Sequence, residues 1–157
     1  MSQERFGKHI SLIYRYSQIF MDQNLSNYNL GSGQYVFLLN LLQNKGVNQE
    51  KLSNILMINK ATTARAIKKL EKEGYVVRNT SNEDKRSYEL YPTEKAEAIE
   101  AVLMKLLDTW NGILLKDFSD EEKDQLFILI EKVGNNLFNN LEHFGNHDED
   151  MDLENID

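Results

Sequence analysis

The basic side chains of this sequence are concentrated between Lys45 and Arg86. Of 18 basic and 25 acidic residues in the 157-residue chain, this stretch holds ten and five. Lysine and arginine neutralise the phosphates of nucleic acids, and arginine also reads the edges of bases. Because the whole chain carries a net charge of −7, the basic stretch is a candidate surface for nucleic acid. A charged surface that only faces solvent would give the same counts.

The residues from Lys60 to Glu73 have the two faces expected of a helix that lies in a DNA major groove. One face is apolar or small and would pack on a core: Thr63, Ala66, Ile67 and Leu70. The other face and its flanks are small or basic: Ala61, Thr62, Arg65, Lys68, Lys69 and Lys72. Small residues near the start of the helix would let its backbone approach the groove, and a helix N-terminus favours phosphate. An ordinary surface helix with outward-facing lysines is the alternative.

A polar loop follows this helix and ends in a second basic group. Lys85 and Arg86 lie at the end of the loop 79–86, and an arginine there could enter a minor groove, where the negative potential is strong. Asp84 could pair with an arginine and stabilise the loop, or it could only help to form the turn.

The elements that would position these side chains are mainly α-helical, with one small β-hairpin. Helices are predicted at about 4–26, 33–44, 49–56 and 60–73, strands at 75–78 and 87–91, and two long helices from about 93 and 119. Helix ends are marked by the candidate caps Ser32, Asn48, Asn59, Thr93 and Ser119, and by Gly74. Three short helices followed by a hairpin is the order of a winged helix-turn-helix.

Over about residues 6–141 the sequence resembles the MarR family of transcription regulators. Three segments carry the resemblance: LGSGQYVFLLNLLQNKGVNQEKLSNIL, NKATTARAIKKLEKEGYVVR and DKRSYELYPTEKA. The last matches the wing signature of the family through Asp84, Arg86 and Thr93. The sequence departs from the family pattern at Met57, where glycine is common in the turn between two helices, and at Pro92 and Ala96.

The resemblance implies a homodimer that binds a pseudo-palindromic operator as a sequence-specific transcription regulator, most often a ligand-responsive repressor. It divides the chain into an N-terminal dimerisation helix at 1–30, a winged helix-turn-helix DNA-binding domain at 31–92 and C-terminal dimerisation helices at 93–145. The residues 146–157 are rich in acids and include no base, and from this composition we expect an acidic disordered tail. We expect Arg65 and Thr62 at base edges, beside the small Ala61. We expect phosphate contacts from Lys60, Lys68 and Lys69, and wing contacts from Lys85 and Arg86. The alternative is a winged helix that binds a protein instead of specific DNA.

Members of the family often bind a small phenolic or other aromatic effector between the dimerisation helices and the winged domain. Six aromatic residues could line such a pocket: Tyr14, Tyr16, Phe20, Tyr35, Phe37 and Trp110. Packing in the core explains the same residues, and we favour that interpretation. The peroxide-sensing mechanism of the family uses a cysteine, and this chain has none.

Several other function classes lack the residues that they require. With no cysteine and three histidines outside any catalytic motif, we expect no enzymatic activity and no cofactor beyond a possible aromatic effector. His143 and His147 have the spacing of a metal-binding pair on a helix, but Gly145 lies between them, and we expect no metal site. No apolar run approaches the roughly 18 residues of a membrane helix, and because Met1–Arg5 lead into no apolar region of the signal-peptide kind, we expect no signal peptide. We therefore expect a cytoplasmic protein.

Overall fold

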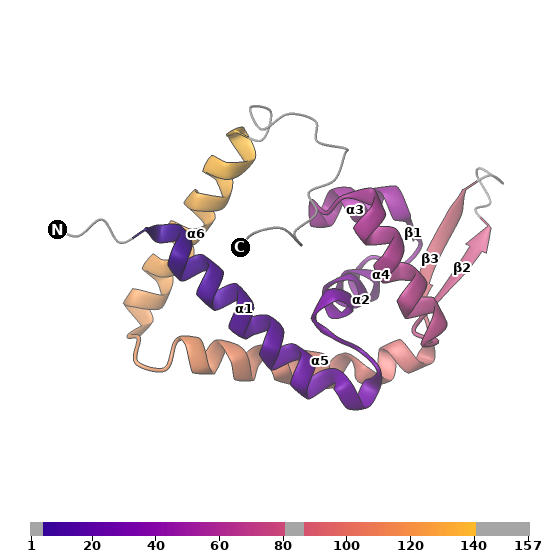
Figure 1. The fold of residues 1–157 in the computed structure, drawn as a ribbon, viewed down its shortest axis with the longest axis horizontal. Helices are drawn as coiled ribbons and strands as arrows, with labels where there is room; N and C mark the ends of the chain where they lie inside the picture. Colours follow the sequence, from indigo (N-terminus) through magenta and orange to yellow (C-terminus); the bar gives the residue numbers. More distant parts are fainter. Residues whose placement is uncertain (1–4, 81–86, 141–157) are drawn as a thin grey trace. The chain divides into compact units, whose positions relative to one another are not determined.

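The computed structural model describes residues 5–80 and 87–140, which form helices and one small sheet (Figure 1). The chain divides into two compact units, Met1–Asn111 and Gly112–Asp157. The first unit contains, in order, α1 (Phe6–Leu25), the 3-10 helix η1 (Ser26–Tyr28), α2 (Ser32–Gln43), β1 (Val47–Asn48), α3 (Gln49–Leu56), α4 (Lys60–Lys72), β2 (Val76–Thr80) and β3 (Tyr88–Pro92). Helix α5 (Glu94–Leu114) begins in the first unit and ends in the second, which also contains α6 (Asp120–Asn140).

The prediction of a mainly helical fold with a small β wing is confirmed. The domain boundaries inferred from the family resemblance stay a prediction. The acidic tail at 146–157 lies outside the described residues.

Helices α2, α3 and α4 pack around one apolar core together with the sheet. Leu38 and Leu41 of α2, Leu52 of α3, and Ile67 and Leu70 of α4 are fully buried in it. Burying one such side chain contributes roughly 1.5–3 kcal/mol to folding. These contacts hold α4 with its apolar face inward, so its basic face points away from the core.

The sheet has three antiparallel strands in the order β1-β3-β2. Leu90 in the central strand pairs with Val47 on one side and with Arg78 on the other, and its side chain is buried in the core. The hairpin of β2 and β3 was predicted from the sequence. Strand β1 was not, because two residues are too few to show the alternation of a strand.

The predicted helix caps Asn48, Asn59 and Thr93 are confirmed. In each case the side-chain oxygen accepts the backbone N–H three residues further on, at 2.8, 2.7 and 3.4 Å respectively. Gly74 follows α4 with a φ of 76°, a left-handed conformation that glycine adopts without steric cost. The two ends of α4 are therefore defined by local sequence.

The start of α2 differs from the prediction that Ser32 is its cap. Ser32 is the first helical residue, and Gly31 occupies the cap position without a side chain that could accept a hydrogen bond. Instead, a carboxylate oxygen of Asp22 in α1 accepts the N–H of Ser32 at 2.6 Å. A Cβ atom at Gly31 would lie 2.8 Å from the same oxygen. The cap is thus supplied by another helix, which local sequence cannot show.

The C-terminal end of α4 is attached to α5 and to η1. Lys95 of α5 donates a hydrogen bond to the carbonyl of Glu73 at 2.6 Å, and its ammonium lies 4.2 Å from the centroid of the Tyr75 ring. The Tyr75 hydroxyl donates to the carbonyl of Tyr28 at 2.8 Å. Because Tyr75 is buried, these contacts attach the end of α4 firmly to its neighbours.

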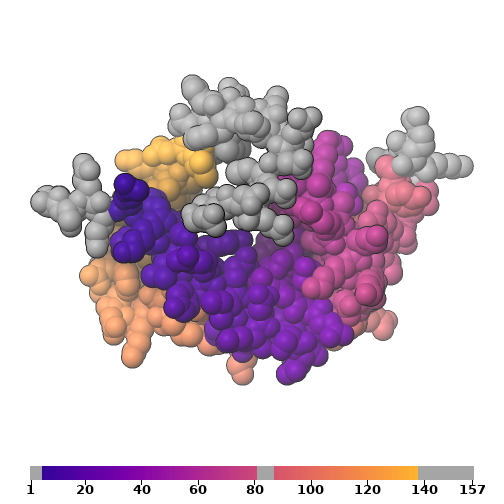
Figure 2. Space-filling model, in the orientation of Figure 1, coloured from indigo at the N-terminus to yellow at the C-terminus, as the bar shows by residue number. Residues whose placement is uncertain are grey.

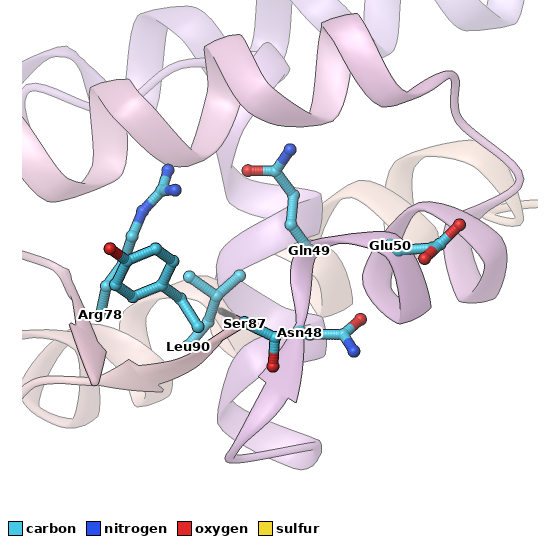
Figure 3. A pocket seen from close by; sticks show the side chains of 7 residues that line it. Asn48, Gln49, Glu50, Arg78, Ser87 and Leu90 are labelled. Atoms are coloured by element: carbon cyan, nitrogen blue, oxygen red, sulfur yellow. The ribbon is translucent and has the colours of Figure 1, made fainter. Parts of the chain in front are cut away.

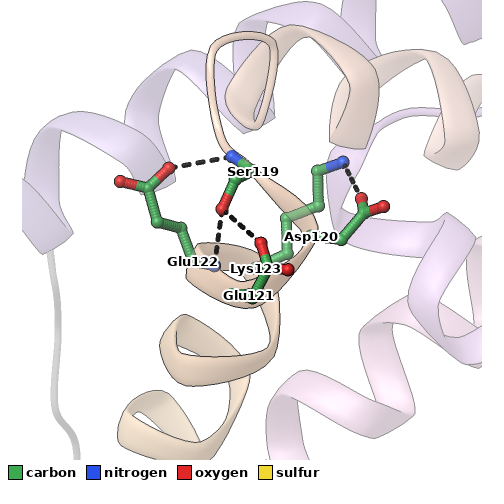
Figure 4. A network of polar contacts seen from close by, with 5 residues as sticks. All are labelled: Ser119, Asp120, Glu121, Glu122 and Lys123. Atoms are coloured by element: carbon green, nitrogen blue, oxygen red, sulfur yellow. Dashed lines mark hydrogen bonds and ion pairs between the residues drawn. The ribbon is translucent and has the colours of Figure 1, made fainter.

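In the second unit, α6 starts with the predicted capping box (Figure 4). The Ser119 N–H donates to a carboxylate oxygen of Glu122 at 2.8 Å, and the Ser119 hydroxyl accepts the Glu122 N–H at 3.2 Å. A hydrogen bond from Lys123 lowers the pKa of Asp120, the first residue of the helix. Carboxylates in the first turn also stabilise the helix, because they lie near the positive end of its dipole.

The apolar side chains of α6 are exposed. Six of them have exposed fractions between 43% and 65%: Phe127, Ile128, Leu129, Ile130, Val133 and Leu137. None of the α6 side chains up to residue 137 is buried. An exposed apolar helix of this kind is typical of a surface that binds another protein chain.

Candidate nucleic-acid interface

Helix α4 separates its buried and exposed side chains as the sequence predicts. The buried side consists of Thr63, Ala66, Ile67 and Leu70. The exposed side consists of Ala61, Arg65, Lys68, Lys69 and Lys72, with Thr62 half-buried at its edge. Four of these exposed side chains are cationic, so the outer face of α4 carries the positive charge that contacts with phosphates need.

Thr62 and Arg65, the two side chains expected at base edges, are in contact with each other. The guanidinium of Arg65 donates a hydrogen bond to the Thr62 hydroxyl at 3.3 Å. The backbone N–H of Thr62 is in turn held by Asn59 at the helix start. Arg65 is therefore oriented by a residue in the first turn of α4.

Lys60, expected at a phosphate, forms an ion pair with Glu50 of α3. The ammonium lies 3.0 Å from a carboxylate oxygen, and both side chains are about two-thirds exposed. An ion pair this exposed is worth about 0–1 kcal/mol. The contact with Glu50 is therefore a weak one.

A shallow cavity of about 310 Å³ lies between the start of α3 and the β2–β3 hairpin, from the middle of the ladder toward its loop end (Figure 3). Arg78 of β2 and Gln49 of α3 both line it. Arg78 also donates to Glu71 of α4 at 2.8 Å, which joins the hairpin to α4. Sequence reasoning assigned no role to Gln49 or Arg78 in the site, because their proximity depends on how α3, α4 and β2 pack.

The end of the hairpin loop is not among the described residues. Thr80 pairs with Tyr88 at the last described position of the ladder. Asp84, Lys85 and Arg86 lie between these residues and outside the described part of the chain. Their expected roles in stabilising the wing and contacting a minor groove stay predictions.

Comparison with known proteins identifies the family. Residues 30–88 match the model of the MarR family. The solved structure of a MarR transcriptional regulator from Methanosarcina mazei is 41% identical and has a TM-score of 0.81, covering 87% of this chain and 99% of that one. The chain belongs to the MarR family. The resemblance inferred from the sequence motifs is thereby confirmed, and with it membership of a family of transcriptional regulators.

Two further relatives cover most of the chain. An uncharacterized HTH-type transcriptional regulator of Bacillus subtilis, YybA, is 30% identical over 130 residues, which are 83% of this chain and 87% of that protein. A structure from Listeria monocytogenes, described as a MarR family transcriptional regulator complexed with a 26mer DNA, is 28% identical with a TM-score of 0.85. The match covers 94% of this chain and 99% of the chain from Listeria monocytogenes.

Met57 occupies the position between α3 and α4 where MarR proteins commonly have glycine. Its φ and ψ angles are 53° and 38°, in the left-handed region, and its side chain is 67% exposed. The methionine has therefore not removed the left-handed turn. A residue with a Cβ atom adopts this conformation at a cost of roughly 1–2 kcal/mol.

The structure brings three of the six candidate effector residues to one cavity. Tyr14 of α1 and Tyr35 and Phe37 of α2 line a space of about 240 Å³ that also reaches Thr62 of α4. Phe37 is buried, and Tyr35 packs against the core. In this MarR protein, Tyr35 and Phe37 thus both belong to the packing of the core and line the cavity.

The other three aromatic residues do not line this cavity. Phe20 stacks on Trp110 of α5 with ring centroids 5.1 Å apart and an interplanar angle of 29°. Tyr16 is 58% exposed on α1. The surface of α1, indigo in Figure 2, continues into the purple surface of α2.

Two further properties concern only the part of the chain that the structure describes. No group of three metal-ligating side chains could hold an ion there, and the candidate pair His143 and His147 lies outside this part. No helix within residues 5–80 and 87–140 is both long and apolar enough to cross a membrane.

Proposed function

We propose that this MarR protein is a cytoplasmic homodimer that binds a pseudo-palindromic DNA operator and represses transcription until a small ligand weakens its binding. The observation that carries the proposal is the outer face of α4, where four cationic side chains are exposed opposite a fully buried apolar face. The relative from Listeria monocytogenes, whose structure includes DNA, supports it.

In this proposal α4 is the recognition helix. Arg65 and Thr62 contact base edges, next to the small Ala61 that allows close approach. Phosphate contacts come from Lys60, Lys68 and Lys69. Lys85 and Arg86 extend from the wing toward the minor groove, and Asp84 stabilises the wing. The two copies of α4 in a dimer would lie one helical turn apart, about 10 base pairs.

The exposed apolar helices support a homodimer. Helix α1 exposes Phe6, Ile10, Leu12, Ile13, Tyr16 and Ile19, each with an exposed fraction of at least 44%. Helix α6, in the other unit, exposes six large apolar side chains. Soluble monomers rarely leave so many large apolar side chains exposed on a helix, and a second copy of the same helices would cover them.

The test is binding of two DNA duplexes of equal length and composition, the promoter region upstream of the protein's own gene and a scrambled version. We expect the promoter DNA to bind about 10³-fold more tightly or better at physiological salt, as measured by fluorescence anisotropy. Equal binding of both duplexes would contradict specific regulation, and it would favour a winged helix that binds a protein partner.

A further inference from the structure

The half of the β2–β3 hairpin nearer its loop is not held by buried side chains. Among the described residues of β2 and β3, the buried side chains are those of Val76 and Leu90. Thr80 and Tyr88, at the last described pair of the ladder, are both exposed. Leu90 lies opposite Arg78, so the part of the hairpin beyond Arg78 projects from the core. Burial therefore does not fix the direction of this projecting part.

One side of the projecting part faces open space. The cavity of about 310 Å³ lies between it and the start of α3, and Arg78 and Tyr88 line the cavity from the hairpin (Figure 3). Strand β2 is also an edge of the three-stranded sheet, so within the described residues no further strand pairs with its outer side. Two paired strands alone are only marginally stable in water. A contact from outside the sheet is therefore needed to give the hairpin one direction.

That contact comes from Glu71 in the last part of α4. The Nε–H of Arg78 donates to a carboxylate oxygen of Glu71 at 2.8 Å, and the two side chains are 34% and 28% exposed. A charge-assisted hydrogen bond from a planar guanidinium restricts direction as well as distance. An ion pair near the surface contributes little to the free energy of folding. Its position matters more, because it joins the hairpin to α4 where the projecting part begins.

The angle between the hairpin and α4 matters when both bind one duplex. In the proposed function α4 enters a major groove while the wing reaches the adjacent minor groove. The two grooves lie at fixed positions along the duplex, so both contacts form together most favourably when the angle is already set before binding. A hairpin free to bend toward the cavity would lose conformational freedom on binding, and its contact would be weaker.

We propose that Glu71 and Arg78 are positioning residues, whose ion pair holds the hairpin at the angle to α4 that lets the wing reach the minor groove beside the half-site. The inference rests on the proposed function, because it needs α4 in the major groove. It does not require either side chain to touch DNA.

The test uses operator duplexes that share the same half-sites and carry either A·T or G·C base pairs in the flanking minor groove. A·T tracts have a narrower and more negative minor groove, so the wild type should prefer A·T flanks by about fivefold or more at physiological salt. A duplex with scrambled half-sites measures the separate preference that comes from α4. Competition binding followed by fluorescence anisotropy gives both preferences. Equal binding of the two flanks by the wild type would overturn the proposal.

Glu71→Ala removes the ion pair without removing a cation. It should reduce the preference for A·T flanks to about twofold or less and leave the preference for the half-sites unchanged. Glu73→Ala is the matched control, because it removes the same charge two residues further on, and the described hydrogen bonds of Glu73 are made by its backbone. This control should keep the flank preference of the wild type. Equal flank preferences in the two variants would contradict the proposal, as would an equal loss of both preferences in Glu71→Ala.

Exchanging the two charges tests the pair itself. The double variant Glu71→Arg with Arg78→Glu keeps the net charge and reverses the ion pair, so it should restore the flank preference to within about twofold of the wild type. If Arg78 acted by contacting DNA, a carboxylate in its place would not restore the preference, and that result in a folded double variant would overturn the positioning role.

Circular dichroism shows whether each variant folds, and Glu71→Gln is the milder replacement if Glu71→Ala does not. Failure of the proposed function is distinguishable, because the wild type would then bind operator and scrambled half-sites equally, whatever the flanks.

Discussion

At the scale of single residues, the cationic side chains of α4 differ in how they are held. Arg65 is oriented by a hydrogen bond to Thr62, whereas Lys60 is in an exposed ion pair with Glu50. A planar guanidinium in a defined orientation can form two hydrogen bonds to a guanine, which an ammonium cannot do with the same geometry. This difference supports the proposal that Arg65 recognises bases and that Lys60 contacts a phosphate.

Two replacements of Arg65 separate its effect on base recognition from the effect of its charge. Arg65→Ala should reduce the preference for operator over scrambled DNA by about 1–3 kcal/mol, measured by competition binding. Arg65→Lys removes the planar guanidinium but keeps the charge. It should therefore lose a similar part of the preference while retaining affinity for scrambled DNA. Full preference in Arg65→Lys would indicate that Arg65 contacts only the DNA backbone.

Met57 stores conformational strain in the turn before α4. Because its φ is 53°, replacing it with glycine should raise the free energy of unfolding by about 1 kcal/mol in urea denaturation. Met57→Ala retains the Cβ atom and should give no such gain. If both variants had the same stability, the strain would not come from the backbone conformation.

At the scale of elements, the sequence predicted α4 to within one residue at each end, because its boundaries and its faces depend on local signals. Asn59 caps it, Gly74 ends it, and Ile67 and Leu70 repeat at the helical period. The contacts that were missed join residues far apart in the chain. The Asp22 cap of α2, the pairing of β1 with β3 and the contact of Arg78 with Glu71 all depend on tertiary packing.

The six aromatic residues proposed for an effector pocket show the same limit of prediction from sequence. Tyr14 and Tyr35 meet at one cavity because α1 packs on α2, whereas Phe20 meets Trp110 of α5. Composition alone could not divide the six aromatic residues between a cavity and a stacked pair. Their arrangement follows from the relative rotation of helices, which a single sequence does not reveal.

Gly46, between α2 and β1, tests the packing of the sheet. Its φ is 82°, and a Cβ atom there would lie 3.0 Å from the hydroxyl oxygen of Tyr91 and 3.2 Å from the adjacent ring carbon. Gly46→Ala should therefore lower the free energy of unfolding by about 1–3 kcal/mol. Gly33→Ala, in open space in a helix, should leave stability unchanged or raise it slightly. Equal effects of the two substitutions in urea denaturation would refute this reading of Gly46.

At the scale of the whole molecule, the buried core and the α6 part of the proposed dimer surface lie in different units. The buried core belongs to the first unit, and the described side chains of α6 contribute nothing to it. The exposed apolar residues of α6 are therefore available to a second copy of the chain. In this account, dimerisation places two recognition helices on one operator, and loss of the dimer should reduce affinity without unfolding the first unit.

Ile130→Glu tests whether α6 contributes to dimerisation without contributing to the core of the first unit. A charge within the exposed apolar surface of α6 should convert the dimer to a monomer in sedimentation velocity and weaken operator binding, while circular dichroism stays close to that of the wild type. Lys132→Glu, another exposed position on the same helix, is the control and should remain dimeric. A dimeric Ile130→Glu variant would show that this part of α6 lies outside the interface.

The most direct test of DNA binding by α4 is the salt dependence of operator affinity in the wild type, Lys68→Ala and Lys105→Ala. Lys105 is an exposed lysine of α5 and serves as the control. The logarithm of the affinity should fall linearly with the logarithm of salt concentration, and Lys68→Ala should reduce the steepness by about 1. Lys105→Ala should leave it unchanged. Affinity independent of salt, or equal slopes for the wild type and Lys68→Ala, would contradict the assignment of α4 as the surface that binds DNA.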